Sequence, residues 1–171
     1  KRQIRALIKE RRLAQTDKPA KSREITAKLL AMPEFAAAQT ILFYVNTAEE
    51  VDVHPALTQS LVLEKTTVVP YCVAGDELAL FVLKDPAELE PGAYGILEPK
   101  LSLRAAAERK CTAAKLDLVI IPGVAFDARG ARRGRGVQNS IWSKAGQKFK
   151  EILVYAPSPR PDPFALDESR P

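Results

Sequence analysis

Apolar residues recur at two different spacings along the chain, and each spacing predicts a different element. Residues 4–13 place apolar side chains at helical intervals with basic ones between them, which predicts a basic amphipathic helix. A second helix is predicted over residues 22–30, with Ser22 as its N-cap and its end at Met32-Pro33, because the residue before a proline avoids the α region. Pro55 is placed to begin a third helix, over residues 55–63.

Short runs of consecutive apolar residues predict buried strands that alternate with these helices. The runs are residues 40–45, 66–70, 78–83, 116–121 and 152–155. They are rich in β-branched and aromatic residues, as buried strands are. Such alternation is typical of βαβ units, so the predicted fold class is α/β, a three-layer α/β/α arrangement with a mostly parallel sheet.

Length and composition fit one domain of this kind. The chain has 171 residues with a mean hydropathy of −0.14, and five of its 13 prolines lie in the last 15 residues. We therefore expect a single domain over residues 1–155 and a proline-rich tail over residues 156–171 that is extended or disordered.

The cysteine and histidine contents exclude two kinds of site and bear on location. Two cysteines are too few for a disulfide framework, and with one histidine they provide no ligand cluster for zinc. Both thiols are expected to be reduced, and His54 to be a surface or helix-capping residue. No apolar run approaches the ~18 residues of a membrane span, so the sequence predicts a cytoplasmic protein with no membrane partner.

Ligands of open α/β sheets bind beyond the carboxyl ends of the strands, which directs attention to residues 46–52, 70–72 and 122–136. The last segment holds four arginines and three glycines within residues 129–136, and these carry part of the net charge of +5. Glycine backbone N–H groups and guanidinium groups together suit phosphate oxygens. The pattern matches neither a Walker loop nor a Rossmann loop, and a solvated basic loop with loose affinity for nucleic acid is the alternative interpretation.

Four motifs in this chain resemble those of one enzyme family. Residues 117–136 read D-L-V-I-I-P-G-V-A-F-D-A-R-G-A-R-R-G-R-G, which is similar to the D-L-V-I-x-P-G-x-A-F-D-x-x-G-x-R-L-G-R-G loop of the 5-formyltetrahydrofolate cyclo-ligase family. The K-x-x-x-R at residues 1–5, the Y-V-N through E-V at residues 44–51 and the G-A-Y-G-I-L-E-P at residues 92–99 also resemble that family, in its order. The resemblance covers residues 1–136.

The resemblance implies an ATP-dependent reaction with Mg²⁺ as a further cofactor. The formyl oxygen of 5-formyltetrahydrofolate takes the γ-phosphate, and the neighbouring amine nitrogen closes the ring and expels phosphate. The products are 5,10-methenyltetrahydrofolate, ADP and phosphate. In such chemistry the protein positions the reactants and neutralises charge that spreads over phosphoryl oxygens.

Site residues follow from their positions in the motifs. The resemblance implies nucleotide binding by Lys1, Arg5, Arg132, Arg133, Gly134, Arg135 and Gly136, with Arg135 as the catalytic residue, and substrate binding by Arg5, Val45, Glu50, Tyr94, Arg135 and Gly136. A carboxylate such as Glu50 can accept neighbouring pterin N–H groups, and the ring of Tyr94 can stack on a conjugated ring. Structural interpretations stay open beside these: surface charges for Lys1 and Arg5, core positions for Val45 and Tyr94, and an acid preceding a helix for Glu50.

The chain departs from the family pattern after Gly136. The family continues x-G-Y-Y-D, but here Gln138, Asn139, Ser140 and Ile141 stand at the G-Y-Y-D positions. The family aspartate would bind Mg²⁺, and Ile141 has no oxygen for a hard cation, so the sequence predicts no metal ligand. Either the C-terminal part has diverged, for instance through a frameshift or a shortened gene, which would weaken metal binding and turnover, or the sequence omits residues that the protein has.

Four functions are compatible with these features. An active ATP- and Mg²⁺-dependent cyclo-ligase is favoured, as a monomer whose partners are 5-formyltetrahydrofolate and ATP. A folate- or nucleotide-binding family member without turnover is the alternative. A small basic RNA-binding protein is disfavoured because no aromatic residue lies among the arginines of residues 129–135. An α/β enzyme acting on a phosphorylated sugar lacks a visible acid/base pair.

Overall fold

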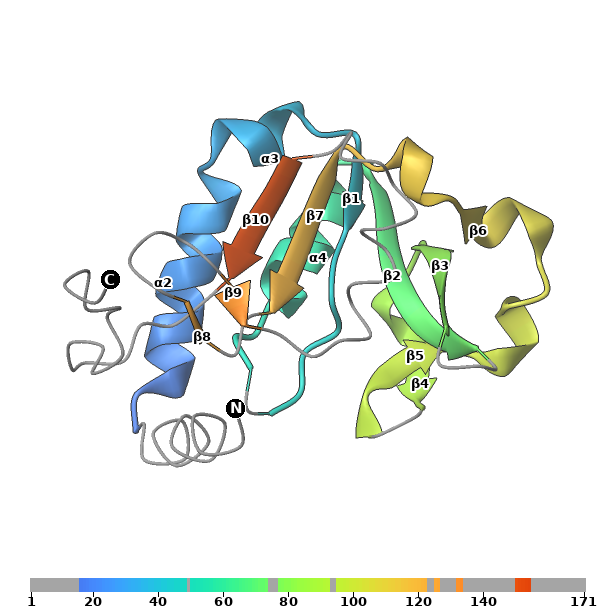
Figure 1. The fold of residues 1–171 in the computed structure, drawn as a ribbon, viewed down its shortest axis with the longest axis horizontal. Helices are drawn as coiled ribbons and strands as arrows, with labels where there is room; N and C mark the ends of the chain where they lie inside the picture. The colour runs from blue at the N-terminus through green and yellow to red at the C-terminus, as the bar shows by residue number, and fades with distance from the viewer. Residues whose placement is uncertain are drawn as a thin grey trace, which may run out of the picture.

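A six-stranded sheet forms the centre of the molecule (Figure 1). The computed structural model describes residues 16–48, 50–73, 77–92 and 95–122, and the backbone of residues 125–126, 132–133 and 150–154. In sheet order the strands are β10 (Lys150–Val154), β7 (Leu118–Pro122), β1 (Thr40–Leu42), β2 (Thr66–Val73), β3 (Glu77–Leu83) and β6 (Lys110–Cys111). The first four run parallel, and β3 and β6 add two antiparallel pairings at one side. The predicted α/β class with a mostly parallel sheet is confirmed.

The register of the central strands depends on one aspartate. Asp117 immediately precedes β7, and its Oδ2 accepts the backbone N–H groups of Gln39 and Thr40 at 3.0 and 2.8 Å. The N–H of Asp117 in turn donates to the carbonyl oxygen of Thr40 at 2.9 Å. This exchange fixes the start of β7 against the start of β1, so their carboxyl ends lie at the same edge of the sheet.

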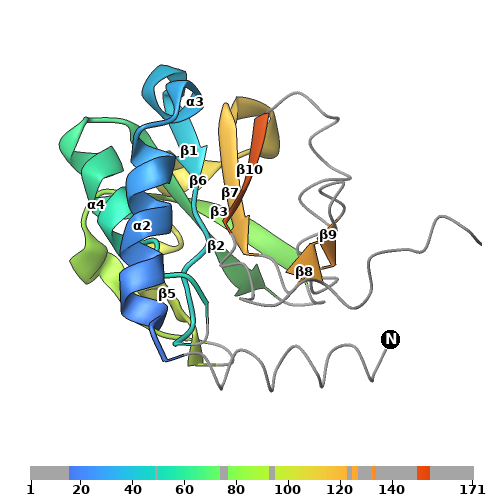
Figure 2. The ribbon, with the colours of Figure 1, turned by 90° about the vertical axis from the view of Figure 1, so that its left-hand side faces the viewer.

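Helices α2 (Lys18–Leu30), α3 (Pro33–Ala37) and α4 (His54–Val62) lie on one face of the sheet (Figure 2). The expected N-cap at Ser22 is wrong, because α2 begins at Lys18. Pro19 is tolerated there, since the first turn of a helix needs no donor from it. The predicted end near Met32-Pro33 is confirmed, and the same proline begins the unpredicted α3. The predicted third helix is α4, with Pro55 in its first turn.

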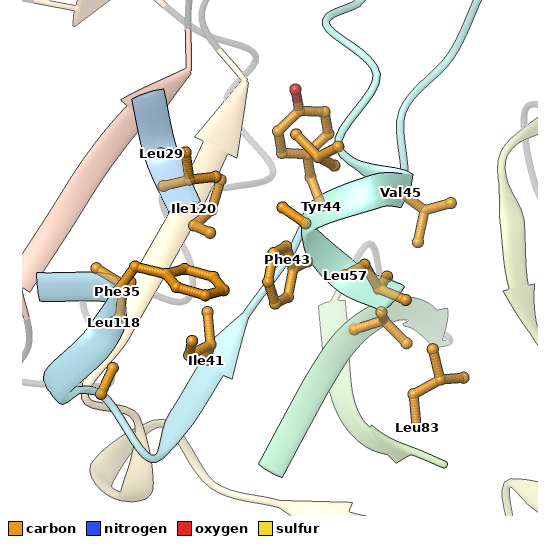
Figure 3. Packing of buried hydrophobic residues seen from close by; sticks show 14 of the residues in the cluster. Leu29, Phe35, Ile41, Phe43, Tyr44, Val45, Leu57, Leu83, Leu118 and Ile120 are labelled. Carbon is orange, nitrogen blue, oxygen red and sulfur yellow. The ribbon is translucent and has the colours of Figure 1, made fainter. Parts of the chain in front are cut away.

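Buried apolar residues form two clusters, one on each face of the sheet. The cluster under the helices contains Leu29, Phe35, Ile41, Phe43, Leu57, Leu118 and Ile120 (Figure 3). The opposite face buries Leu42, Val68, Leu80, Leu116, Val119 and Ile121, with Ala113 of the 3₁₀ helix η5 (Ala113–Lys115) packed against them. Alternate residues of β7 therefore enter different clusters. This explains why the strand is an unbroken apolar run.

The antiparallel side of the sheet differs from the prediction in one respect. Residues 70–72 were expected just beyond the carboxyl end of a strand, but β2 continues through them to Val73 and pairs with β3, Tyr71 opposite Ala79 and Cys72 opposite Leu78. This expectation is wrong because β3 follows as a hairpin partner instead of after a crossover helix. A second hairpin then forms from β4 (Leu89–Pro91) and β5 (Leu97–Pro99).

Short 3₁₀ helices lead to and from this second hairpin. They are η1 (Pro86–Glu88), η3 (Leu101–Leu103) and η4 (Ala107–Arg109). Beyond β7, the strands β8 (Ala125–Phe126) and β9 (Arg132–Arg133) pair in antiparallel fashion. The predicted N-terminal helix and the predicted tail lie outside the described residues. Among the residues described, no helix combines the length and apolar character needed to cross a membrane.

Candidate functional site

The carboxyl ends of β1, β2 and β7 face one edge of the molecule (Figure 1). Residues 46–53 leave β1 there, the β4–β5 hairpin lies by the end of β2, and the β8–β9 pair follows β7. Of the predicted site residues, Val45 and Glu50 are described in full and Arg132 and Arg133 as the backbone of β9. The others lie outside the described residues: Lys1, Arg5, Tyr94, Gly134, Arg135, Gly136 and, at the metal position, Ile141.

Two hydroxyl groups of α2 hold the backbone of the segment that follows β1. The Oγ1 of Thr26 donates to the carbonyl oxygen of Asp52 at 2.9 Å, and the Oγ of Ser22 accepts the N–H of the same residue at 3.1 Å. Ser22 and Thr26 are one helical turn apart and so both reach the backbone of Asp52. Sequence reasoning gave Ser22 a different role and missed Thr26, although the four-residue spacing of two hydroxyl groups was visible.

Residues at the end of β1 hold the same segment from the other side. Tyr44 donates its hydroxyl hydrogen to the carbonyl oxygen of Val51 at 2.7 Å, and the Oδ1 of Asn46 accepts the N–H of Val53 at 3.2 Å. The tyrosine is buried in the core cluster (Figure 3), so its hydroxyl group enters the segment from a fixed ring. Residues 51–53 are therefore bound on both sides, immediately after Glu50.

Glu50 itself forms a reciprocal turn with Thr47. Its Oε2 accepts the Thr47 N–H at 2.9 Å, and its own N–H donates to the Thr47 carbonyl oxygen at 3.1 Å. Within the described part of the chain, the other carboxylate oxygen of this half-buried side chain has no hydrogen-bond partner. One oxygen thus fixes the orientation of the carboxylate, and the second can accept an N–H from a ligand. Val45 is 5% exposed and belongs to the core cluster.

A buried ion pair joins the β4–β5 hairpin to the end of β2. Glu98, 5% exposed, accepts the N–H of Cys72 at 3.1 Å through Oε1 and a hydrogen of Arg104 Nη2 at 3.1 Å through Oε2. Arg104 also donates from Nε to the carbonyl oxygen of Pro99 at 2.7 Å, and its guanidinium lies 4.9 Å from the ring centroid of Tyr71. The G-A-Y-G-I-L-E-P motif included Glu98, but nothing in the sequence indicated its partners.

The remaining polar residues singled out by the sequence have local roles. His54 is the first residue of α4 and its side chain is 37% exposed, in agreement with the surface role expected for it, whereas the carboxylate that accepts its backbone N–H, at 3.0 Å, belongs to Asp52. Among the described residues, neither Cys72 nor Cys111 forms a disulfide. Burial raises the pKa of Cys111 above its ordinary value. In the described ranges, no three His, Cys, Asp or Glu side chains come together as metal ligands.

Comparisons with known proteins agree with one another. The model of the 5-formyltetrahydrofolate cyclo-ligase family matches residues 1–140, a range that ends just before Ile141. A probable 5-formyltetrahydrofolate cyclo-ligase of Schizosaccharomyces pombe is 25% identical over 140 residues, which are 80% of this chain and 67% of the yeast protein.

Two solved structures resemble this fold. The NMR structure of Aquifex aeolicus 5,10-methenyltetrahydrofolate synthetase has a TM-score of 0.71 and 26% identity, covering 91% of this chain and 81% of that one. A Mycoplasma pneumoniae 5,10-methenyltetrahydrofolate synthetase, at TM-score 0.66 and 17% identity over 89% of this chain and 82% of its own, supports the fold alone. Because the family match spans most of the sequence, this chain belongs to the 5-formyltetrahydrofolate cyclo-ligase family.

Proposed function

We propose that this protein converts 5-formyltetrahydrofolate and ATP into 5,10-methenyltetrahydrofolate, ADP and phosphate. The observation that carries the proposal is the family match over residues 1–140, which includes all four motifs quoted above. The position of Glu50 adds support, because the structure holds its carboxylate at the sheet edge with one oxygen available to a ligand. Loops beyond strand ends are where open α/β sheets bind their ligands.

The proposed reaction has two steps. The formyl oxygen attacks the γ-phosphorus, and the bond from that phosphorus to the bridging oxygen breaks so that ADP leaves. The neighbouring amine nitrogen then attacks the activated formyl carbon, the carbon–oxygen bond breaks, phosphate leaves, and the nitrogen loses its proton. Both steps develop negative charge on phosphoryl oxygens, so fixed cationic groups accelerate them.

On the phosphate side we assign the basic residues of two motifs. Arg135 is the proposed catalytic residue, and the remaining nucleotide contacts come from Lys1, Arg5, Arg132, Arg133, Gly134 and Gly136. Support comes from β9, whose backbone pairs with β8 just beyond the carboxyl end of β7. The basic segment therefore starts at the same sheet edge as Glu50. Guanidinium groups suit this work because they bind phosphoryl oxygens in bidentate fashion.

On the folate side we assign Glu50 to the pterin N–H groups and Tyr94 to stacking on the conjugated ring. We propose that Val45, a member of the core cluster, lines the same region. Arg5, Arg135 and Gly136 would contact the substrate as well as ATP. The acidic and aromatic groups thus bind the flat ring, while the cations bind the phosphates.

Mg²⁺ fits this chain less well than ATP does. At the position of the family aspartate stands Ile141, which has no oxygen donor, and the residues described form no other metal-ligand group. We therefore assign Mg²⁺ no protein ligand here. Loss of the Tyr-Tyr-Asp sequence also favours one alternative, a family member that binds folate or nucleotide with impaired or absent turnover.

One assay separates the two functions. The protein is incubated with 5-formyltetrahydrofolate, ATP and Mg²⁺, and the absorbance of the methenyl product is followed while binding of each ligand is measured by calorimetry. Product formation supports the proposed reaction. Folate binding without product supports the alternative, and neither binding nor product contradicts both.

A substitution tests the phosphate assignment in the same assay. Arg135→Ala is expected to weaken ATP binding by about tenfold or more, as loss of a charge-assisted contact does, while folate binding changes less. Arg23→Ala, which removes an exposed arginine of α2, is the matched control and is expected to leave both affinities unchanged. Equal ATP affinities for the two variants would contradict the placement of Arg135.

A further inference from the structure

The buried ion pair of Glu98 and Arg104 has no part in the chemistry proposed above, yet Glu98 belongs to the same sequence motif, residues 92–99, as the proposed folate residue Tyr94. Glu98 accepts hydrogen bonds from the N–H of Cys72 in β2 and from the guanidinium of Arg104 in the turn after η3. Arg104 also donates to the carbonyl oxygen of Pro99 at the end of β5. Buried charges cost free energy unless paired, and an apolar pair is often as stable. Stability alone is therefore a weak reason for an ion pair at this position.

The turn of the β4–β5 hairpin is built directly on the side chain of Glu98. A Cβ atom at Gly92 would lie 2.7 Å from both Cγ and Oε2 of Glu98, closer than van der Waals contact permits. The N–H of Gly92 donates to the carbonyl oxygen of Ile96 at 2.8 Å, and Gly95 has a φ of +73°. Gly92 and Gly95 enclose Tyr94 in the sequence. The position of Gly92 thus depends on where the Glu98 side chain is held.

We propose that Glu98 and Arg104 are positioning residues for folate binding. They hold Gly92, two residues before Tyr94 in the sequence, against the carboxyl end of β2, and this limits where the following residues can meet the substrate. Arg104 keeps the Glu98 carboxylate in place from one side, and the Cys72 N–H keeps it from the other. This inference rests on the proposed function, which assigns Tyr94 to the folate ring.

The chain provides a matched control in a second arginine. Arg109 pairs with Glu88, donates from Nη1 to the carbonyl oxygen of Val82 at 2.9 Å, and places its guanidinium 5.3 Å from the ring centroid of Phe81. Its side chain is 10% exposed, compared with 20% for that of Arg104, so both are mostly buried. Its partner Glu88 lies in η1, immediately before the second hairpin begins at Leu89. A purely structural role would give the two arginines the same kinetic phenotype.

The experiment compares Arg104→Met with Arg109→Met in steady-state kinetics, well below the melting temperature of either variant. For Arg104→Met, the KM for 5-formyltetrahydrofolate is expected to rise about tenfold, while kcat and the KM for ATP stay within about twofold, because only folate binding loses preorganisation. Arg109→Met is expected to keep all three parameters within about twofold despite a similar fall in melting temperature. Arg104→Lys, which keeps the charge, is expected to recover part of the folate KM.

Each other outcome has a defined meaning. Equal changes in the folate KM for both methionine variants, or no change for Arg104→Met, would overturn the positioning role while leaving the proposed function intact. If Arg104→Met does not fold, the comparison is made between Glu98→Gln and Glu88→Gln, with the same expectations. If the unmodified protein binds folate without turnover, the dissociation constant replaces KM. If it does not bind folate at all, both the proposed function and this inference are wrong.

Discussion

Arg104 and Arg109 are held by the same chemistry in two neighbouring regions of the molecule. Each guanidinium pairs with a glutamate, donates to a backbone carbonyl oxygen and lies over an aromatic ring of the antiparallel side of the sheet. The difference lies in the second partner of the glutamate. Glu98 accepts an N–H of Cys72, 26 residues away in β2, whereas Glu88 accepts the N–H of Lys84, four residues away.

This difference separates two uses of one interaction. The Glu88–Arg109 pair closes a local connection between β3, η1 and η4, so its loss should loosen that connection and little else. The Glu98–Arg104 pair joins a hairpin to the end of a strand that borders the predicted site. The role of each ion pair therefore depends on the segments that it joins and not on the type of interaction.

The largest expected effect tests whether the two pairs stabilise the fold equally. Arg104→Met and Arg109→Met each leave a carboxylate buried without its cation, which should lower the free energy of unfolding by about 3 kcal/mol. Urea unfolding followed by circular dichroism measures it. A loss in one variant that exceeds the other by more than about 1.5 kcal/mol, roughly the value of one good hydrogen bond, would show that the pairs are not energetically matched.

A smaller effect is expected at the glycines of the hairpin turn. Gly92→Ala forces its Cβ against the Glu98 side chain, and overpacking of this kind costs about 1–3 kcal/mol. Gly95→Ala meets no atom within 4 Å, but its φ of +73° disfavours any side chain and costs about 1 kcal/mol.

The two alanine variants also sharpen the comparison between the arginines. If Glu98 supports the turn, Gly92→Ala should raise the folate KM as Arg104→Met does. The contacts of Arg109 with Glu88, Val82 and Phe81 should stay unchanged in this variant. Thermal unfolding and the methenyl-product assay measure the two effects. A stable Gly92→Ala variant with unchanged folate KM would contradict the dependence of the turn on Glu98.

Local patterns in the sequence predicted most of the elements, β3 included, but not the antiparallel pairing of β2 with β3. The apolar run was sufficient to predict β7, because a strand buried on both faces is apolar at every position. Pro55 was sufficient to predict the start of α4, because its fixed φ acts on the first turn of the helix. The continuation of β2 to Val73 depends on pairing with β3, a tertiary contact that propensity cannot reveal.

The candidate site shows even more clearly that sequence patterns do not reveal tertiary contacts. The family motifs indicated Glu50 as a site residue and contained Glu98 without giving it a role, and the partners that orient either side chain were not predicted. Thr47 is only three residues from Glu50, and a reciprocal turn is recognisable in principle. Cys72 and Glu98 are 26 residues apart, and their hydrogen bond exists only because β5 lies against β2. Sequence patterns therefore indicate candidate residues but not the tertiary contacts that hold them.

The smallest expected effect uses the two cysteines as reporters of the two regions. Because burial raises the pKa of Cys111, less of it is thiolate at pH 8 than for an ordinary cysteine, and its alkylation should accelerate as the pH rises above the usual thiol range. Cys111 follows Arg109 by two residues, in β6. Arg109→Met should loosen β6, lower that pKa toward its ordinary value and increase the alkylation rate at pH 8 by about threefold.

Arg104→Met is the control for this measurement, since it should leave Cys111 unchanged and instead expose Cys72, whose N–H the Glu98 carboxylate binds. Iodoacetamide labelling followed by peptide mass spectrometry gives the rate at each thiol separately. Faster labelling of Cys111 in both variants would mean that loss of either arginine opens the whole antiparallel side. The two pairs would then act as one structural unit, and a specific effect of Arg104 on folate binding could not be explained by local positioning of the turn.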